Sequence, residues 1–228
     1  MRAQMQLVLF DIDGTLLIGR GVGREATRRA LLEVFGTSGT LDTHHFGGKT
    51  DWLTLAEVLA GDGFTAEAIG QWMGVYEQAL ARHTADLIPA FTVEALPGAL
   101  DTVTALRRRE DMVIGIVTGN VAATAPLKLQ AAGFDPLWFP VGAYGSEALD
   151  RNDLPALALE RATAFCGQPI LPGDVTVIGD TEADIACARA LGARAVAVTT
   201  GFAPRDRLEA ARPDHLLDDL SGLLPLLG

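Results

Sequence analysis

Cysteine and lysine are both scarce in this sequence. Cys166 and Cys187 are the only cysteines among 228 residues, and their spacing matches neither a redox pair nor a zinc site. We therefore expect both thiols to be small core side chains of a protein in a reducing compartment. The only lysines are Lys49 and Lys128, so a lysine with a specific role can be sought in just two places.

Positive charge is limited as well. Lysine and arginine together number 18, against 29 aspartates and glutamates, and the formal net charge is −11. A surface of this sign repels nucleic acid and anionic membranes, so we expect neither as a partner.

Long apolar segments are also lacking. No stretch of the sequence reaches the length of a membrane span, and the apolar run before Asp11 is too short for a secretion signal. We therefore expect a cytoplasmic protein. The chain is nevertheless 49% hydrophobic, so we expect a folded protein with a sizeable core.

The most informative segment, residues 7–17, reads LVLFDIDGTLL. Its apolar start predicts a strand buried on both faces, as in a parallel sheet. The strand ends at Asp11 and Asp13, two carboxylates that repel each other unless a cation or a shared proton compensates. A hard divalent cation is the simplest compensation. An ordinary polar turn after a strand is the alternative interpretation of so short a motif.

The five residues from Asp11 to Thr15, Asp-Ile-Asp-Gly-Thr, resemble the signature of the haloacid dehalogenase-like hydrolases, most of which are magnesium-dependent phosphatases. The resemblance implies that Gly14 and Thr15 belong to the substrate-binding site. It also implies three further pieces at or near the ends of later strands: a hydroxyl residue, a basic residue and more acids.

The hydroxyl residue is found where a second apolar run, residues 112–118, ends in Thr118, Gly119 and Asn120. The Thr118 hydroxyl can donate a hydrogen bond to a phosphate oxygen, and Gly119 lets backbone N–H groups approach an anion at the start of the next helix. Taken alone, these residues could be an ordinary helix N-cap. Their place in the series favours phosphate binding.

The later acids follow a third run, residues 175–179. Asp180 stands at the end of that predicted strand, and Asp184 lies on the first turn of the next helix. Both can therefore face Asp11 and Asp13 and contribute to a metal site. Asp184 could instead be a first-turn acid favoured by the helix dipole.

The basic residue departs from a common family pattern. Many relatives carry Lys-Pro-x-Pro in the region that reads SEALDRNDLP here, residues 146–155, which contains Arg151 but no lysine. Other branches supply the lysine from the helix after the second strand, where this chain has Lys128. We favour Lys128 over Arg151, and the alternative for Lys128 is a solvated helix lysine.

The segment between the first strand and Pro97 has helical periodicity, with apolar faces at residues 26–35, 52–59 and 66–80. We interpret it as an inserted α-helical cap. The predicted division is residues 1–16 and 94–228 for the core and residues 17–93 for the cap.

After Gly98, predicted helices and strands alternate, with strands at residues 112–118, 137–141, 174–178 and 194–198. Alternation of this kind predicts an α/β fold with a doubly wound, Rossmann-like parallel sheet. In such sheets ligands bind at the carboxyl ends of the strands, where the candidate residues fall.

The resemblance implies a mechanism on these positions. Asp11 would attack phosphorus and become an aspartyl phosphate, and Asp13 would protonate the leaving alcohol and then activate water. Mg²⁺ would be bound by Asp11, Asp180 and the backbone carbonyl of Asp13, with Asp184 assisting. The groups that hold the transferring phosphoryl oxygens would be Thr118, Gly119 and Lys128.

The leading expectation is a phosphatase with a helical cap, similar to phosphoglycolate phosphatases, acting on a small phosphorylated metabolite. A sugar-phosphate mutase of the same fold is the first alternative, and a receiver-type phosphoacceptor module is a distant second. Lys49 and Thr50 follow two glycines between predicted cap helices. We expect them to contact the leaving group.

Overall fold

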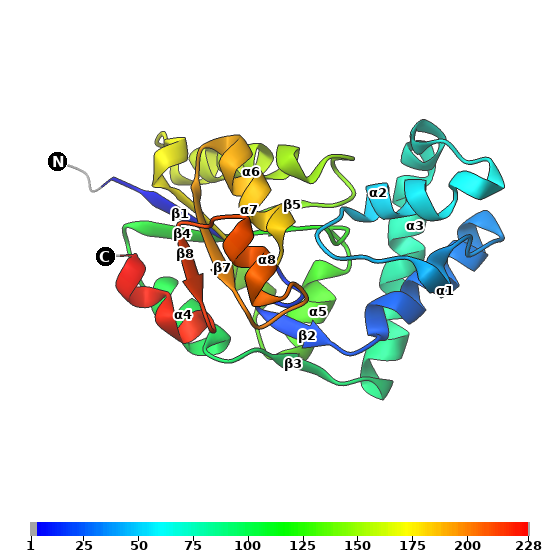
Figure 1. Cartoon of the computed structure of the whole chain (residues 1–228), viewed down its shortest axis with the longest axis horizontal. Helices are drawn as coiled ribbons and strands as arrows, with labels where there is room; N and C mark the ends of the chain where they lie inside the picture. Colours follow the sequence, from blue (N-terminus) through cyan, green and yellow to red (C-terminus); the bar gives the residue numbers. More distant parts are fainter. Residues whose placement is uncertain (1–3, 228) are drawn as a thin grey trace.

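The computed structural model describes residues 4–227 and contains a six-stranded sheet in which every neighbouring pair is parallel (Figure 1). Across the sheet the strands are β5 (Val141–Tyr144), β4 (Met112–Thr118), β1 (Gln6–Phe10), β6 (Val175–Gly179), β7 (Arg194–Val198) and β8 (His215–Leu217). The predicted doubly wound α/β class is confirmed.

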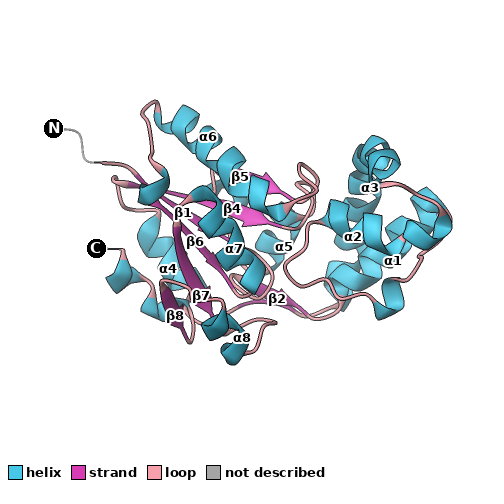
Figure 2. Cartoon of the chain, turned by 45° about the horizontal axis from the view of Figure 1, so that its top comes forward, coloured by secondary structure: helices cyan, strands magenta, loops and turns pink. Residues whose placement is uncertain are grey.

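Helices cover both faces of the sheet (Figure 2). In β1, Val8 and Phe10 pack on the side of α4 (Ala99–Leu106) and α5 (Ala125–Ala131). Leu7 and Leu9 pack on the opposite side, against α6 (Leu154–Cys166), α7 (Glu182–Leu191) and α8 (Arg205–Ala210). Burial on both faces explains why the strand reads as a continuous apolar run instead of an alternating one.

The position of β1 in the sheet determines where a site can form. The chain moves from β1 to β4 and β5 on one side and then returns to β6 on the other. Ligands bind at such switch points, beyond the carboxyl ends of the strands. Asp11 follows β1 and Asp180 follows β6, so the order of the strands brings the two acids together.

Three helices form a separate cluster to one side of the sheet (Figure 1). They are α1 (Val22–Phe35), α2 (Asp51–Val58) and α3 (Ala66–Leu87), and we call them the helical unit. Their shared apolar core includes Tyr76 and also Val121, from the loop after β4. The two connections to the sheet run side by side as a short antiparallel pair, β2 (Leu17–Gly19) and β3 (Val93–Ala95).

The structure differs from the sequence prediction in several boundaries. The strand expected at residues 137–141 is wrong: a 3-10 turn occupies Pro136–Trp138 and the strand begins at Val141. Asp135 accepts a hydrogen bond from the Leu137 N–H, and proline at the first helical position favours the turn. The pairing of β2 with β3 was not predicted.

The described residues, 4–227, include no helix with both the length and the apolar composition of a membrane span.

The helical unit approaches the sheet so closely that only glycine fits at two loop positions. The Asp51 N–H donates to the Gly119 carbonyl at 2.7 Å, and the Trp52 N–H donates to the Gly145 carbonyl at 3.0 Å. A Cβ atom on Gly145 would overlap the Gly119 carbonyl and lie 2.8 Å from the Asp51 nitrogen. Backbone packing of this kind leaves no room for a side chain.

We expect Gly145→Ala to lower the free energy of unfolding by about 1–3 kcal/mol, the usual cost of overpacking. Gly74→Ala is the matched control, because a Cβ there meets nothing within 4 Å in the middle of α3. That change should stabilise the protein by up to about 1 kcal/mol through helix propensity. Urea unfolding of both variants measures these changes in the free energy of unfolding. Equal changes in the two variants would contradict the close backbone contact at Gly145.

Candidate active site

Three buried carboxylates meet at the carboxyl edge of the sheet. Asp11 follows β1, Asp180 follows β6, and Asp184 lies on the first turn of α7. One oxygen from each lies within 4.8 Å of the others. The Asp11 N–H donates to the Ile178 carbonyl at 2.9 Å, so the ladder between β1 and β6 continues to the site and fixes its backbone.

Burial disturbs the protonation of Asp11 and Asp180. It raises the pKa of Asp11 to about 7, against the opposing effect of the Arg151 charge. Burial also raises the pKa of Asp180 well above its ordinary value, and the neighbouring charges of Asp184 and Asp11 add to the effect. Carboxylates in this situation stay ionised only with a compensating cation.

The trio has the donor chemistry that a hard divalent cation requires. Mg²⁺ prefers carboxylate oxygen ligands, and all three residues supply them from a buried position. Asp13 does not contribute its side chain to the trio, because that carboxylate is held by other residues. The residues present therefore fit a magnesium ion.

Asp180 is held by residues from two segments, the turn after Asp13 and the loop after β7. Its Oδ2 accepts the Phe202 N–H at 2.6 Å, and its Oδ1 lies 3.4 Å from the Thr15 hydroxyl. Gly14 adopts a φ of 87°, and a Cβ there would overlap the Asp180 carboxylate. Glycine at the turn after Asp13 is therefore required both by the backbone conformation and by the approach of the acid.

Asp184 caps its own helix and also belongs to the acid trio. Its Oδ2 accepts the Thr181 N–H at 3.0 Å and the Thr181 hydroxyl at 2.7 Å, as a first-turn acid does. Its Oδ1 accepts a hydrogen bond from Arg151 and faces the acid trio. Helix capping and a place in the site are not exclusive at this position.

Asp13 belongs to a second group of polar side chains. Its Oδ2 accepts hydrogen bonds from Lys128 Nζ at 2.7 Å and from Asn120 Nδ2 at 2.8 Å. Lys128 also donates to Asn120 Oδ1 at 2.6 Å, which closes a triangle. Lys128 is only 7% exposed, so it is not a solvated helix lysine.

Arg151, the alternative to Lys128 for the basic residue, lies beside Asp11. Its guanidinium is 3.1 Å from Asp11 Oδ1 and also donates to Asp184. The side chain is buried, and its Nε has no hydrogen-bond partner among the described residues. The two buried cations thus serve different acids: Arg151 pairs with Asp11 and Asp184, and Lys128 pairs with Asp13.

The loop after β4 supplies the predicted phosphate-binding groups. Thr118 is fully buried, and its hydroxyl oxygen accepts hydrogen bonds from Asn120 Nδ2 at 2.8 Å and from the Asn120 N–H at 3.3 Å. A Cβ on Gly119 would overlap the Lys49 carbonyl oxygen. These residues adjoin the Asp13 group through Asn120.

Lys49 and Thr50 approach the site with their backbone, while their side chains interact elsewhere. Lys49 Nζ forms an ion pair with Glu57. The Thr50 hydroxyl donates to the Leu149 carbonyl at 2.9 Å, and its oxygen accepts the Leu53 N–H at 3.0 Å to cap α2. Their role as leaving-group contacts stays a prediction.

Two residues that the sequence analysis did not select also hold the site together. The Thr200 hydroxyl donates to the Gly14 carbonyl at 2.8 Å, and Phe202 binds Asp180 through its backbone. They lie in the loop after β7, where the sequence reads Thr199-Thr-Gly-Phe202. A strand followed by hydroxyl residues and glycine is the same signal that marked the loop after β4.

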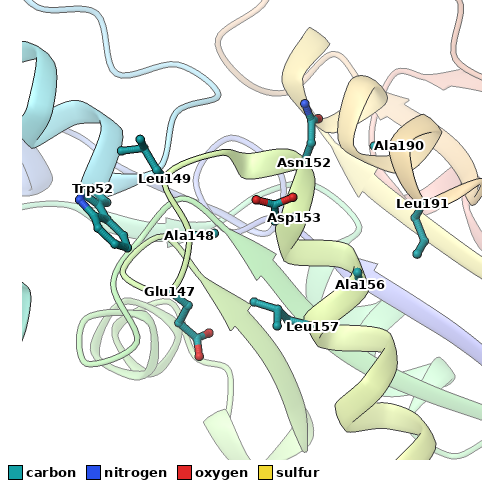
Figure 3. A pocket seen from close by; sticks show the side chains of 10 residues that line it. All are labelled: Trp52, Glu147, Ala148, Leu149, Asn152, Asp153, Ala156, Leu157, Ala190 and Leu191. Carbon is teal, nitrogen blue, oxygen red and sulfur yellow. The ribbon is translucent and has the colours of Figure 1, made fainter. Parts of the chain in front are cut away.

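A cavity of about 650 Å³ is lined by residues other than the acid trio. Trp52 from α2, Leu149, Asp153 and Leu191 are among its lining residues (Figure 3). None of Asp11, Asp13, Asp180 and Asp184 lines it, so it lies outside the candidate site.

Comparison with known proteins agrees with this geometry. Residues 8–189 match the family model of the haloacid dehalogenase-like hydrolases. A phosphoglycolate phosphatase of Synechococcus elongatus is 31% identical over 221 residues, covering 96% of each chain. The pyrophosphatase PpaX of Bacillus mycoides is 27% identical, over 98% of this chain and 97% of its own.

A solved structure of a Pseudomonas syringae hydrolase superposes with a TM-score of 0.67 at 25% identity, and the match covers 98% of both chains. This structural match and the matches to the two curated relatives extend over both the sheet and the helical unit. The chain therefore belongs to the haloacid dehalogenase-like hydrolases, as a phosphatase similar to the phosphoglycolate phosphatases.

Proposed function

We propose that this phosphatase is magnesium-dependent and hydrolyses a small phosphorylated metabolite through an aspartyl-phosphate intermediate. The observation that carries the proposal is the contrast between two carboxylates that are one residue apart. Asp11 belongs to the buried acid trio and pairs with Arg151, whereas Asp13 is held by Lys128 and Asn120. Different surroundings for two neighbouring acids support different chemical roles.

Asp11 is the proposed nucleophile. Its carboxylate attacks phosphorus and forms an aspartyl phosphate while the P–O bond to the leaving alcohol breaks. Water then hydrolyses the aspartyl phosphate, which releases inorganic phosphate and regenerates the Asp11 carboxylate. When bound, Mg²⁺ would neutralise charge on the phosphoryl oxygens. The ion would be held by Asp11, Asp180, Asp184 and the backbone carbonyl of Asp13. Arg151 adds fixed positive charge at Asp11.

Asp13 is the proposed general acid and base. It gives its proton to the leaving oxygen and later takes one from the attacking water. Lys128 and Asn120 both donate to the same Asp13 oxygen, Oδ2. They fix the orientation of the carboxyl group and leave its other oxygen available for proton transfer.

Residues 17–93 are the proposed cap, with residues 1–16 and 94–228 as the core. The helical unit has an apolar core of its own, and backbone hydrogen bonds connect it to the loops after β4 and β5. In this arrangement the leaving group would be enclosed between α1 and the Asp13 group. Gly23 of α1 lies close to that group, since a Cβ there would be 3.8 Å from Lys128 Nζ.

We expect phosphate release from at least one small phosphate ester, and full dependence on a hard divalent cation. The panel should include phosphoglycolate, pyrophosphate, sugar phosphates and an aryl phosphate, because relatives carry the first two names. Asp11→Asn should reduce turnover by about three orders of magnitude or more, as for loss of a covalent nucleophile.

Malachite-green assays with Mg²⁺ and with excess EDTA make this measurement. Near-normal turnover of Asp11→Asn in a sample free of deamidation would show that the nucleophile is misassigned. Isomerisation of a sugar phosphate without net phosphate release would favour the mutase alternative.

The raised pKa values give a second prediction. In the folded, metal-free protein the Asp11 carboxyl keeps its proton up to about pH 7, whereas in the unfolded chain it loses the proton near pH 4. The retained proton stabilises the folded state, and this stabilisation is lost as pH rises through about 7. A bound cation replaces those protons. The thermal stabilisation by Mg²⁺ should therefore be larger at about pH 8 than at about pH 5.

Differential scanning fluorimetry with and without Mg²⁺ tests this expectation. Asp180→Asn is the control variant, because removal of one ligand charge should reduce both the stabilisation and its pH dependence. Equal shifts in melting temperature at both pH values would contradict a site in which metal and protons compete.

The two cations can be separated by substitution. Lys128→Ala should lower kcat by about a hundredfold, as for the loss of a preorganised charge donor. Arg151→Ala should be at least as harmful, because it leaves Asp11 and Asp184 without their positive partner. The sequence alone predicts that Lys128→Ala is the more harmful change. A much smaller loss of kcat in Arg151→Ala than in Lys128→Ala, with both variants folded, would support that prediction instead.

A further inference from the structure

Asp51 contacts the peptide groups on both sides of Asn120. Its N–H donates to the Gly119 carbonyl at 2.7 Å, and its Oδ2 accepts the Val121 N–H at 2.9 Å. Asp51 is the first residue of α2, whereas Asn120 lies in the loop after β4, so the contact joins the helical unit to the sheet.

A second carboxylate of the helical unit acts on the same loop. Glu77, from α3, accepts the Ala123 N–H at 2.7 Å. The loop also inserts Val121 into the apolar core of the helical unit, where this side chain is fully buried. The loop is thus held by two carboxylates and an apolar anchor, all provided by the helical unit.

Asn120 is the residue whose position these contacts control. It bridges Lys128, Asp13 and Thr118 with its side-chain amide. Because a side-chain amide follows its backbone, fixing both flanking peptide groups fixes where its N–H and oxygen point. The burial that raises the pKa of Asp51 to about 6 agrees with a group enclosed at this junction.

We propose that Asp51 is a positioning residue that orients Asn120, and through it the Lys128–Asp13 pair, only while the helical unit lies against the sheet. The helical unit thereby contributes to the arrangement of the proposed proton donor. This inference rests on the proposed function for its kinetic consequence, while the contact itself can be measured without any substrate.

The first test is amide exchange in the whole protein. Asp51→Ala should accelerate hydrogen exchange at Val121, because that N–H loses its acceptor, and exchange in β6 should stay unchanged. Glu67→Ala is the matched control: Glu67 is also a first-turn acid of a cap helix, but it is exposed. Unchanged exchange at Val121 in folded Asp51→Ala would overturn the contact, whatever the enzyme's substrate.

The second test separates positioning from simple structural support. An alkyl leaving group needs the proton from Asp13 much more than an aryl leaving group does. Asp51→Ala should therefore lower kcat for an alkyl phosphate by about tenfold more than for an aryl phosphate, a scale typical of misplaced catalytic groups. Asp51→Asn keeps an acceptor oxygen and should recover most of that loss.

A double-substitution cycle identifies the residue through which Asp51 acts. Once Asn120→Ala is present, adding Asp51→Ala should change kcat little, because the two act in series. Faster exchange at Val121 combined with equal losses for alkyl and aryl phosphates would overturn the positioning role. Additive effects of the two substitutions would overturn it as well. Inactivity of the wild type on all phosphate esters would instead contradict the proposed function and leave the exchange result standing.

Discussion

The mutual repulsion of carboxylates buried at one edge of the sheet is the constraint on which the rest of this structure depends. Parallel strands β1 and β6 bring Asp11 and Asp180 together, and α7 adds Asp184. Burial favours protonation of Asp11 and Asp180, so a compensating positive charge has to be built in or bound. Arg151 supplies part of it from the segment before α6. The remaining demand is what makes the trio a suitable site for a hard cation.

The same constraint explains why glycine and backbone groups are so common around the site. Gly14 and Gly201 both approach the Asp180 carboxylate where a Cβ would overlap it. The Phe202 N–H then satisfies that carboxylate without adding charge. On the other side of the site, Asp13 is separated from the trio by its contacts with Lys128 and Asn120. A chain with a net charge of −11 thus concentrates two buried cations where a phosphate would bind.

Much of the site could be predicted from the sequence because its information is local. Each motif joins an apolar strand to the polar residues at its end. Parallel pairing of the strands then brings those polar residues together at one edge of the sheet. The pairing of Arg151 with Asp11 depended on how the segment before α6 folds back over the sheet, which no local pattern records. The contact of Phe202 with Asp180 could not be predicted from its residue type, because Phe202 acts through its backbone N–H. The strand expected at residues 137–141 failed for a local reason, since Asp135 and Pro136 start a helical turn there.

The central claim is that Asp11 and Asp13 have different roles, with only Asp11 becoming covalently phosphorylated. Rapid acid quench during turnover, followed by peptide mass spectrometry, tests it most directly. The account predicts one added phosphoryl group on the peptide that contains Asp11, located at Asp11 by fragmentation and lost after treatment with hydroxylamine. A phosphoryl group on Asp13 would contradict the account. The absence of a phosphoryl group from both residues, in the wild type and in Asp13→Asn alike, would contradict it as well.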